Sequence, residues 1–403
     1  MCLFISCTQQ DNESDISVFG ENNLPEEQDT NFIGSSEIEN IANDIFVTEK
    51  TIFSKDGMKK NIVDIEPIGT NEEKPSYYII NYEDGGFLIM SGDKRALPVL
   101  AFSDENNFDL DAESFPGLLI DWLESQDSYI KKIREETTND SIISVPEEEW
   151  NIENIENFIA SKANNKNASV LGKTNCSSAT LDFQYGPLLS TNWGQGAGYN
   201  NSAPDYGCTD YINGRTPTGC VATAMSQIMR YYEYPSSYNW SIMPNNIGSD
   251  ETSRLMRDAG DSVGMNWGCS GSGAQTSNVP NALKSTFGYS SANYTDFSIP
   301  YTKTELSLGY PVILRGGERV TKWLIFNVYD NGHAWVCDGI REYTVPVRIQ
   351  AGRWGYITTC QNAWTYHMNW GWSGSHNGWY SSGWQVGNDS FSYEAGMVYN
   401  IRS

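Results

Sequence analysis

Cys220 lies where a nucleophilic thiol is most readily made, at the first residue of a predicted helix. The apolar residues that follow it have the spacing of a buried helical face: Val221, Ala224, Met225 and Ile228. Unpaired N–H groups and the positive end of the helix dipole stabilise a thiolate at such a position. The plainer alternative is a small buried core residue, which is what most free cysteines are.

A thiolate nucleophile needs a base, and the chain has three histidines, His333, His367 and His376. His333 lies in residues 331–339, a short run with a glycine near each end that predicts a strand. A strand holds the imidazole rigidly enough for proton transfer, and Gly332 leaves space beside the ring. We therefore expect His333 to be the general base, against the alternative of a hydrogen-bonded core histidine.

Asn369 is a candidate partner for the base. Strand alternation places His367 and Asn369 on one face of residues 366–374, and Met368 and Trp370 on the other. An asparagine amide oxygen can accept the second N–H of an imidazole and fix its tautomer. The alternative for this tryptophan-rich segment is an aromatic core ladder.

Gln195 lies 25 residues before Cys220, in a segment of small and polar residues. Together with the backbone N–H of Cys220, its side chain is suited to donating hydrogen bonds to the oxyanion of a tetrahedral intermediate. A surface turn is the alternative for a single glutamine in a loop.

The charge of the chain divides it into two parts. Of the 403 residues, 39% are hydrophobic and 13% aromatic, enough to fold despite a net charge of −25. Residues 1–160 carry 35 acidic and 10 basic side chains, whereas residues 161–403 carry 16 of each, with 11 of the 13 tryptophans. We expect two domains with different roles, of which the first is acidic and accompanies the second. The absence of a basic patch argues against nucleic-acid binding, and no apolar run reaches the ~20 residues of a transmembrane helix.

The eight cysteines have neither CxxC pairs nor the spacing of zinc ligands, so we expect no metal and no cofactor. Cys208 and Cys269 lie in segments rich in glycine and serine and are candidates for a disulfide, although spacing does not fix connectivity. Residues 3–7 resemble a bacterial lipobox in which Cys7 is lipidated, as at the end of a longer export signal. The alternative is a frayed N-terminus with a chance cysteine.

The first part contains several predicted elements. Residues 11–43 are polar, acidic and unperiodic, which predicts no fixed structure. Two β-rich runs, 77–81 and 87–91, flank Glu-Asp-Gly-Gly and predict a hairpin. The apolar periodicity of residues 115–134 predicts an amphipathic helix. Residues 138–180, rich in asparagine, serine, glutamate and lysine, are typical of a linker.

Both parts are predicted to be α+β. Strands followed by a helix predict a small α+β unit over residues 45–137. In the second part, helical segments come first, at 220–232, 251–263 and 279–287, and β-like, tryptophan-rich segments follow from residue 311. This order indicates an α+β domain of about 220 residues.

The order Gln, Cys, His, Asn resembles that of the papain clan, and the sequence is more specifically similar to the streptopain and interpain family of bacterial cysteine proteases. The motifs that carry this resemblance are residues 219–224 (Gly-Cys-Val-Ala-Thr-Ala), 227–229 (Gln-Ile-Met), 332–334 (Gly-His-Ala) and 369–372 (Asn-Trp-Gly-Trp). The resemblance runs through most of residues 185–400. In the first part, residues 84–87 and 91–100 resemble the inhibitory propeptide of this family.

The resemblance implies a papain-like α+β fold, with a helical part and an antiparallel sheet part, preceded by a small α+β prodomain. It implies a secreted cysteine endopeptidase zymogen that hydrolyses peptide bonds with a Cys220 thiolate and His333, with Gln195 as oxyanion donor and no metal. In papain the asparagine precedes Ser-Trp-Gly, whereas Asn369 is followed directly by Trp370. Either residue is therefore a candidate to face the imidazole.

The expected organisation is an export segment and disordered tether (1–43), an inhibitory propeptide (44–137), a linker with the processing site (138–184) and a papain-like catalytic domain (185–403). The expected partners are protein or peptide substrates and the propeptide itself, acting as an intramolecular inhibitor. The expected location is secreted or in the bacterial cell envelope, with a lipid anchor at Cys7.

Three other functions stay open at this point. The chain could be a catalytically impaired relative that acts as a binding protein or inhibitor, a Cys-His cell-wall amidase, or a carbohydrate-binding module. Retention of Gln195, Cys220, His333 and Asn369 together argues against the first. The glycine-flanked strand positions of many tryptophans are typical of a core and argue against the third.

Overall fold

The computed structural model describes residues 29–45, 60–112, 115–135, 143–159, 176–211, 213–316, 323–326, 332–350, 355–382 and 396–403. Residues 1–31 form one unit and residues 32–403 a second. All elements named below belong to the second unit.

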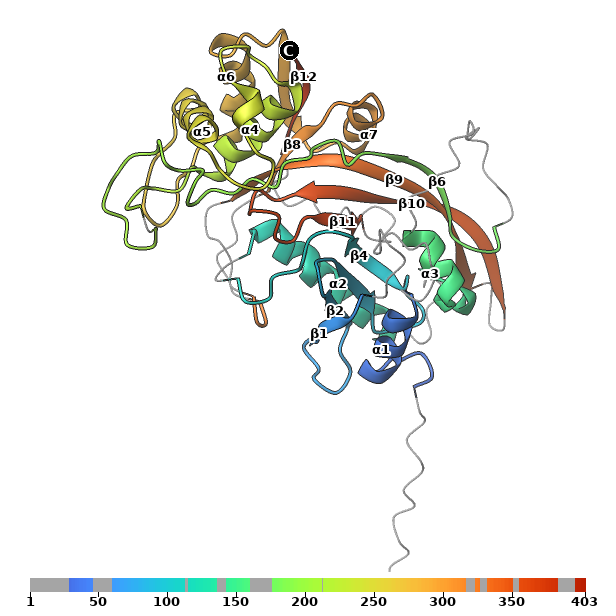
Figure 1. Cartoon of the computed structure of the whole chain (residues 1–403). Helices are drawn as coiled ribbons and strands as arrows, with labels where there is room; N and C mark the ends of the chain where they lie inside the picture. The colour runs from blue at the N-terminus through green and yellow to red at the C-terminus, as the bar shows by residue number, and fades with distance from the viewer. Residues whose placement is uncertain are drawn as a thin grey trace, which may run out of the picture. The chain divides into compact units, whose positions relative to one another are not determined.

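The strands of the described residues form a twelve-stranded antiparallel sheet with the order β1-β2-β3-β4-β11-β10-β9-β8-β12-β7, and β5 and β6 also pair with β9 (Figure 1). The strands are β1 (Ile62–Ile68), β2 (Tyr77–Tyr82), β3 (Phe87–Ser91), β4 (Val99–Ser103), β5 (Ile143–Ser144), β6 (Thr180–Tyr185), β7 (Ser291–Asp296), β8 (Val312–Gly316), β9 (His333–Gln350), β10 (Tyr356–Asn369), β11 (Gly378–Ser381) and β12 (Gly396–Arg402).

The α-helices are α1 (Ser35–Asp44), α2 (Gly117–Glu135), α3 (Ile152–Ile159), α4 (Cys220–Tyr232), α5 (Asp250–Ser262), α6 (Val279–Ser285) and α7 (Ile299–Ser307). Short 3₁₀ helices are η1 (Glu147–Trp150), η2 (Trp240–Ile242) and η3 (Thr276–Asn278). The predicted α+β class, with helices first and strands later in the second part, is confirmed.

The predicted hairpin and amphipathic helix of the first part are also confirmed. Strands β2 and β3 pair antiparallel, and Asp84, Gly85 and Gly86 in their turn have φ values of +62°, +89° and +108°. A Cβ on Gly85 would lie 2.2 Å from the carbonyl oxygen of Glu105, so this position requires glycine. Helix α2 buries one face, which includes Trp122.

Two predictions about the first part are wrong. Residues 11–43 were expected to lack fixed structure, but residues 35–44 form α1, because Ile38 and Ala42, four residues apart, bury one face of an otherwise polar helix. The predicted linker contains η1, α3 and two strands, since Trp150, Ile155 and Phe158 join a hydrophobic core with strands of the sheet. In both segments a few apolar residues outweigh the polar composition.

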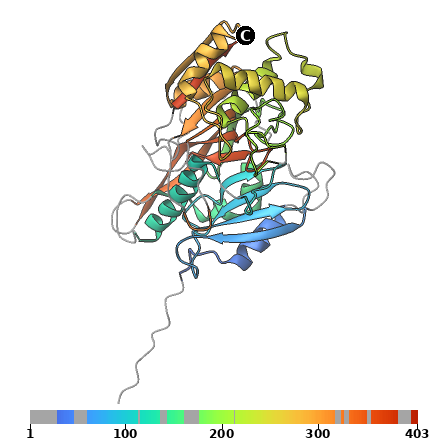
Figure 2. The ribbon, with the colours of Figure 1, turned by 90° about the vertical axis from the view of Figure 1, so that its left-hand side faces the viewer.

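The sheet around the start of β9 separates two cores. Strand alternation places Val312 and Leu314 of β8 in a core shared with α2, whereas Ile313 joins a core shared with α4, α5 and α6. Figures 1 and 2 show these three helices on the far side of β9 and β10 from strands β1 to β4. At this point of the sheet, α2 of the first part therefore covers one side, and α4, α5 and α6 cover the other.

Two disulfides lie in the described residues. The candidate pair Cys208–Cys269 is bonded, and a second bond, Cys176–Cys360, which spacing did not indicate, joins the segment before β6 to β10. Within the described part of the chain, no helix has both the length and the apolar character needed to cross a membrane.

Candidate active site

Cys220 is the first residue of α4, and the helix has the bounds predicted from the sequence. Gly219 precedes it with a φ of +84°, and a Cβ there would lie 2.6 Å from the carbonyl oxygen of Ser272. The position before Cys220 therefore requires glycine. The Cys220 side chain is buried, and Cys220 and Cys337 are the free cysteines of the described residues.

The surroundings of the thiol favour its protonated form. Burial raises the pKa of the Cys220 thiol, while hydrogen bonds from the backbone N–H groups of Ala334, Val221 and Cys220 itself lower this pKa by a smaller amount. The predicted contribution of the helix start is present, but desolvation exceeds it. Burial at this site therefore opposes ionisation of the Cys220 thiol.

His333 is the first residue of β9 and pairs with Gly316 of β8. Its imidazole is buried among indole rings, parallel to Trp335 and edge-on to Trp372. The Nε2–H donates to the carbonyl oxygen of Trp370 at 2.8 Å, because a carbonyl can only accept. Nδ1 is then the unprotonated nitrogen, and burial lowers the pKa of His333 to about 4.

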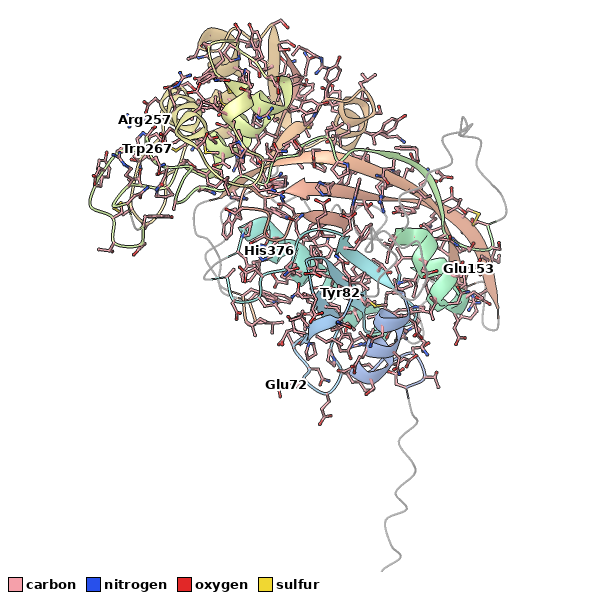
Figure 3. The ribbon with its side chains drawn as sticks, viewed as in Figure 1. Glu72, Tyr82, Glu153, Arg257, Trp267 and His376 are labelled. Atoms are coloured by element: carbon pink, nitrogen blue, oxygen red, sulfur yellow. A yellow bond between two sulfur atoms is a disulfide. The ribbon has the colours of Figure 1, made fainter. Side chains whose placement is uncertain are left out.

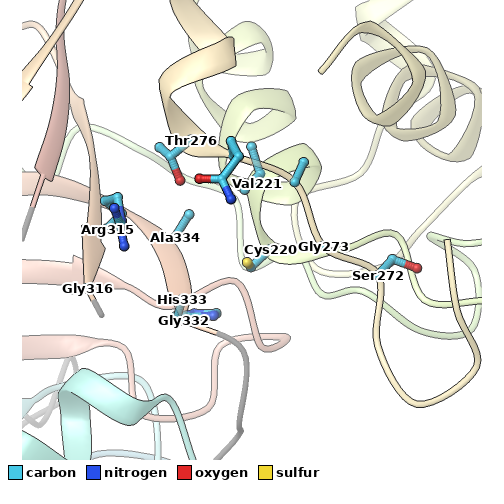
Figure 4. A pocket seen from close by; sticks show the side chains of 12 residues that line it. Cys220, Val221, Ser272, Gly273, Thr276, Arg315, Gly316, Gly332, His333 and Ala334 are labelled. Carbon is cyan, nitrogen blue, oxygen red and sulfur yellow. The ribbon is translucent and has the colours of Figure 1, made fainter. Parts of the chain in front are cut away.

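Cys220 and His333 line one pocket (Figure 4). The pocket lies between the start of α4, the 272–276 segment and the paired ends of β8 and β9. Among the described residues, Nδ1 of His333 has no hydrogen-bond partner, so the thiol and the imidazole are not hydrogen-bonded to each other. The thiol and the imidazole therefore line one pocket without a hydrogen bond between them.

Of the two candidate partners for the imidazole, Trp370 meets it, through its backbone carbonyl. The Asn369 side chain is engaged elsewhere: Nδ2 donates to the carbonyl oxygen of Thr191 at 2.6 Å, and Oδ1 accepts from Nε2 of Gln227 at 3.1 Å. Asn369 therefore joins β10, α4 and the segment that leads to Gln195.

Gln195 lies in a loop that is tied to the start of α4. Its carbonyl oxygen accepts the backbone N–H of Thr218 at 3.0 Å, two residues before Cys220. Its side chain is partly exposed and has no hydrogen-bond partner in the part of the chain that the structure describes. Gln195 is not among the residues that line the pocket.

The other two histidines lie away from the pocket. Nδ1 of His367 is 2.6 Å from Oδ1 of buried Asp338, whose other oxygen accepts the backbone N–H of Leu189 at 2.9 Å. His376, labelled in Figure 3, lies in the segment that connects β10 to β11 and is fully buried. Neither side chain is placed to accept a proton from Cys220.

Seven lining residues had no motif to indicate them: Ser272, Gly273, Ala274, Gln275, Thr276, Arg315 and Gly316. For Arg315 the available signal is a single charge at the end of an otherwise apolar run, residues 311–314. Small polar residues such as those of 272–276 are typical of any loop and carry no such signal.

The first part of the chain packs against the wall of this pocket. A Cβ on Gly316 would lie 2.8 Å from Cδ1 of Leu118 in α2, so the helix and the strand are in close contact. Nε1 of Trp122 donates to the carbonyl oxygen of Ser381 at 2.8 Å. Beside this contact, β4 pairs with β11 and continues the sheet.

His376 is a further contact between the two parts. Its Nε2 donates to the carbonyl oxygen of Asp109 at 3.0 Å, and its backbone N–H donates to that of Asn107. The rings of Phe108 and Phe115 lie 4.6 Å and 5.0 Å from the imidazole. Burial lowers the pKa of His376 to about 4.

We expect acid to weaken this contact. A histidine whose pKa falls from about 6.5 to about 4 on burial stabilises the docked state fully above pH 6.5. That contribution, roughly 3 kcal/mol, is lost as the pH falls towards 4. In a non-processing Cys220→Ala chain, tryptophan fluorescence and protease sensitivity should therefore report opening between pH 6.5 and 4.

His376→Gln keeps a hydrogen-bond donor, removes the titration and should make this opening less steep. His333 titrates in the same window, so part of the response persists. Burial raises the pKa of Glu149 to about 7, which acts in the opposite direction in both chains. Superimposable pH profiles for the two chains would show that His376 does not control the contact.

A free cysteine at a helix start and a histidine at a strand start, lining one pocket between helices and an antiparallel sheet, are typical of a cysteine peptidase. Comparison with known proteins supports this class. Residues 193–239 and 235–380 match the Peptidase C10 family, and residues 30–142 match the family described as Spi protease inhibitor.

The relatives agree with these matches. The chain is 27% identical over 353 residues to streptopain of Streptococcus pyogenes, covering 75% of this chain and 73% of that protein. It is also 27% identical over 349 residues to the thiol protease/hemagglutinin PrtT of Porphyromonas gingivalis, covering 76% of this chain and 34% of PrtT. Prointerpain A of Prevotella intermedia shares the fold, with a TM-score of 0.51 and 22% identity over 85% of this chain and 99% of that one. The chain is a streptopain-like cysteine endopeptidase zymogen with an N-terminal propeptide.

Proposed function

We propose that Cys220 is the nucleophile of this endopeptidase, His333 its general base and Gln195 a donor to the oxyanion. The observation that carries this assignment is that Cys220 and His333, from the starts of α4 and β9, line one pocket. A thiol and an imidazole on two different elements can meet there after a small rearrangement.

In the proposed reaction, Nδ1 of His333 takes the Cys220 proton, and the thiolate attacks the carbonyl carbon of the scissile peptide bond. The resulting oxyanion accepts hydrogen bonds from the Cys220 backbone N–H and the Gln195 amide. When the tetrahedral intermediate collapses, the imidazolium returns the proton to the leaving amine. Water, deprotonated by His333, then hydrolyses the thioester and restores the thiol.

Trp370 and Asn369 have supporting roles in this proposal. The Trp370 carbonyl holds the proton on Nε2 of His333, which leaves Nδ1 free to act as the base. Asn369 positions the Gln195 loop through Thr191 rather than orienting the imidazole. The alternatives of an inactive binding protein and a cell-wall amidase are not favoured, because the relatives are named as proteases.

We propose that the first part of the chain inhibits the enzyme by holding the pocket wall. This rests on the contact of Leu118 with Gly316 and on the unpaired state of His333. The propeptide would extend from about residue 32, since α1 buries Ile38 against its strands. Cleavage would fall between α3 and β6, partly outside the described residues.

Export and acylation of Cys7, which lies outside the described residues, also belong to this proposal. An extracellular location is consistent with two disulfides. The substrates would be proteins or peptides.

Adding the separately expressed propeptide, residues 32–159, to the matured enzyme tests the inhibition. We expect dose-dependent loss of casein hydrolysis, because the fragment would restore the contacts of α2 and β4. A fragment with Leu118→Asp is the matched control and should inhibit less. The absence of inhibition at micromolar excess, with full activity of an uncleavable precursor, would contradict the proposal.

Gln195→Ala is expected to lower kcat by about 10²–10³-fold, the usual cost of removing one oxyanion donor. The reason is that the amide stabilises charge that develops only in the transition state, so KM should change little. Gln361→Ala, inside β10 and outside the pocket, is the control. Equal kcat values for the two variants would make Gln195 an ordinary loop residue.

A further inference from the structure

Arg315 is the one permanently charged residue among the described residues that line the pocket. It follows three buried apolar residues in β8, and the strand pairs it with Ala334 of β9 and Gly396 of β12. Alternation places it on the same face as Ile313, towards the core that contains Cys220. Figure 4 shows Arg315 across the pocket from Ser272.

Arg315 lies on the strand next to the residue that contacts the Cys220 sulfur. The backbone N–H of Ala334 hydrogen-bonds Cys220, and Ala334 is the β-ladder partner of Arg315. Neighbouring strands lie about 4.8 Å apart. The guanidinium can therefore reach the side chain of a substrate residue beside the scissile bond.

Within the part of the chain that the structure describes, the guanidinium of Arg315 has no partner. Other arginines of the second part form ion pairs: Arg230 with Glu233, Arg254 with Glu251, Arg257 with Asp261 and Arg402 with Glu305. Among the described residues, Arg315 has no ion pair and no hydrogen bond, although it is only partly exposed. A half-buried unpaired charge is unfavourable unless a ligand compensates it.

We propose that Arg315 makes the enzyme select an acidic side chain, glutamate or aspartate, at the substrate residue that enters this pocket. A guanidinium presents paired donors that match the two oxygens of a carboxylate. The hydroxyl of Thr276, which also lines the pocket, adds a donor of the kind that a carboxylate accepts. This inference rests on the proposed function, because it concerns the same site.

The test uses full chains that have matured under identical conditions. The substrates are fluorogenic peptides that differ by one Glu-for-Gln replacement, placed in turn at three positions before and two after the scissile bond. The enzymes are wild type, Arg315→Gln, Arg315→Glu and Arg348→Gln. The last removes the same charge from β9, where Arg348 pairs with exposed Glu148 of the propeptide. Titration with iodoacetamide and circular dichroism establish equal numbers of folded active sites.

At one position, wild type and Arg348→Gln should cleave the Glu peptide with a kcat/KM about tenfold or more above that of the Gln peptide. Arg315→Gln should lose this ratio, because its kcat/KM falls more for the Glu peptide than for the Gln peptide, and Arg315→Glu should prefer a Lys peptide. Cys220-dependent cleavage without a Glu preference, or with one that survives Arg315→Gln, would overturn the inference and leave the proposed function intact. Failure of matured wild type to cleave any peptide or casein would overturn both.

Discussion

Cys220→Ala is expected to abolish peptidase activity and leave the fold intact. Loss of a nucleophile that acts together with its base costs about 10⁴-fold or more in kcat. The structural cost is small, because alanine suits a helix start and only one sulfur atom is removed from the core. Casein hydrolysis, active-site titration and the thermal midpoint would be measured on the same preparation.

Cys337 provides the matched control for this experiment. It is the other free cysteine of the described residues, fully buried in β9, and its Sγ faces the carbonyl oxygen of Gly339. Burial raises its pKa well above the ordinary value. Cys337→Ala should lower stability by about 1 kcal/mol and keep its activity. Substantial turnover by Cys220→Ala would place the nucleophile elsewhere.

His333→Ala is expected to lower kcat by about 10³-fold or more, because the thiol loses its proton acceptor. His367→Ala and His376→Ala should retain peptidase activity. The His367 side chain contacts Asp338, and the His376 side chain contacts the Asp109 carbonyl, so neither faces Cys220. After maturation, all three variants would be compared with wild type for kcat and for the pH dependence of Cys220 alkylation.

The alkylation profile separates a catalytic from a structural role for His333. If the imidazole activates the thiol, its removal shifts rapid alkylation to the higher pH of an isolated cysteine. A merely destabilised enzyme would lose active sites without this shift. Near-wild-type kcat in His333→Ala would assign the base to another group.

Local patterns predicted the elements that carry the site. Helix α4 has the predicted bounds because the spacing of Val221, Ala224 and Met225 encodes a buried face directly. The turn between β2 and β3 followed from Gly85 and Gly86, which adopt positive φ. The α+β class followed from the order of such segments.

Features that depend on distant contacts were not predictable. The partner of His333 is a backbone carbonyl, which every residue possesses, so no side-chain type at Trp370 could indicate it. The pKa of the Cys220 thiol is raised because its burial outweighs the effect of the helix start. Helix α3 is held by contacts with strands far away in sequence, and composition alone made it resemble a linker.

The ladder between β4 and β11 has a consequence for the activated enzyme. Tyr380 is paired with Ala101, and Trp379 with Phe102, so the propeptide supplies the hydrogen-bonding neighbour of a catalytic-domain strand. Once the propeptide is removed, we expect β11 to become an edge strand with free backbone groups. Such an edge is a template for pairing with another chain. We therefore expect the enzyme without its propeptide to self-associate more readily at high concentration than the full chain.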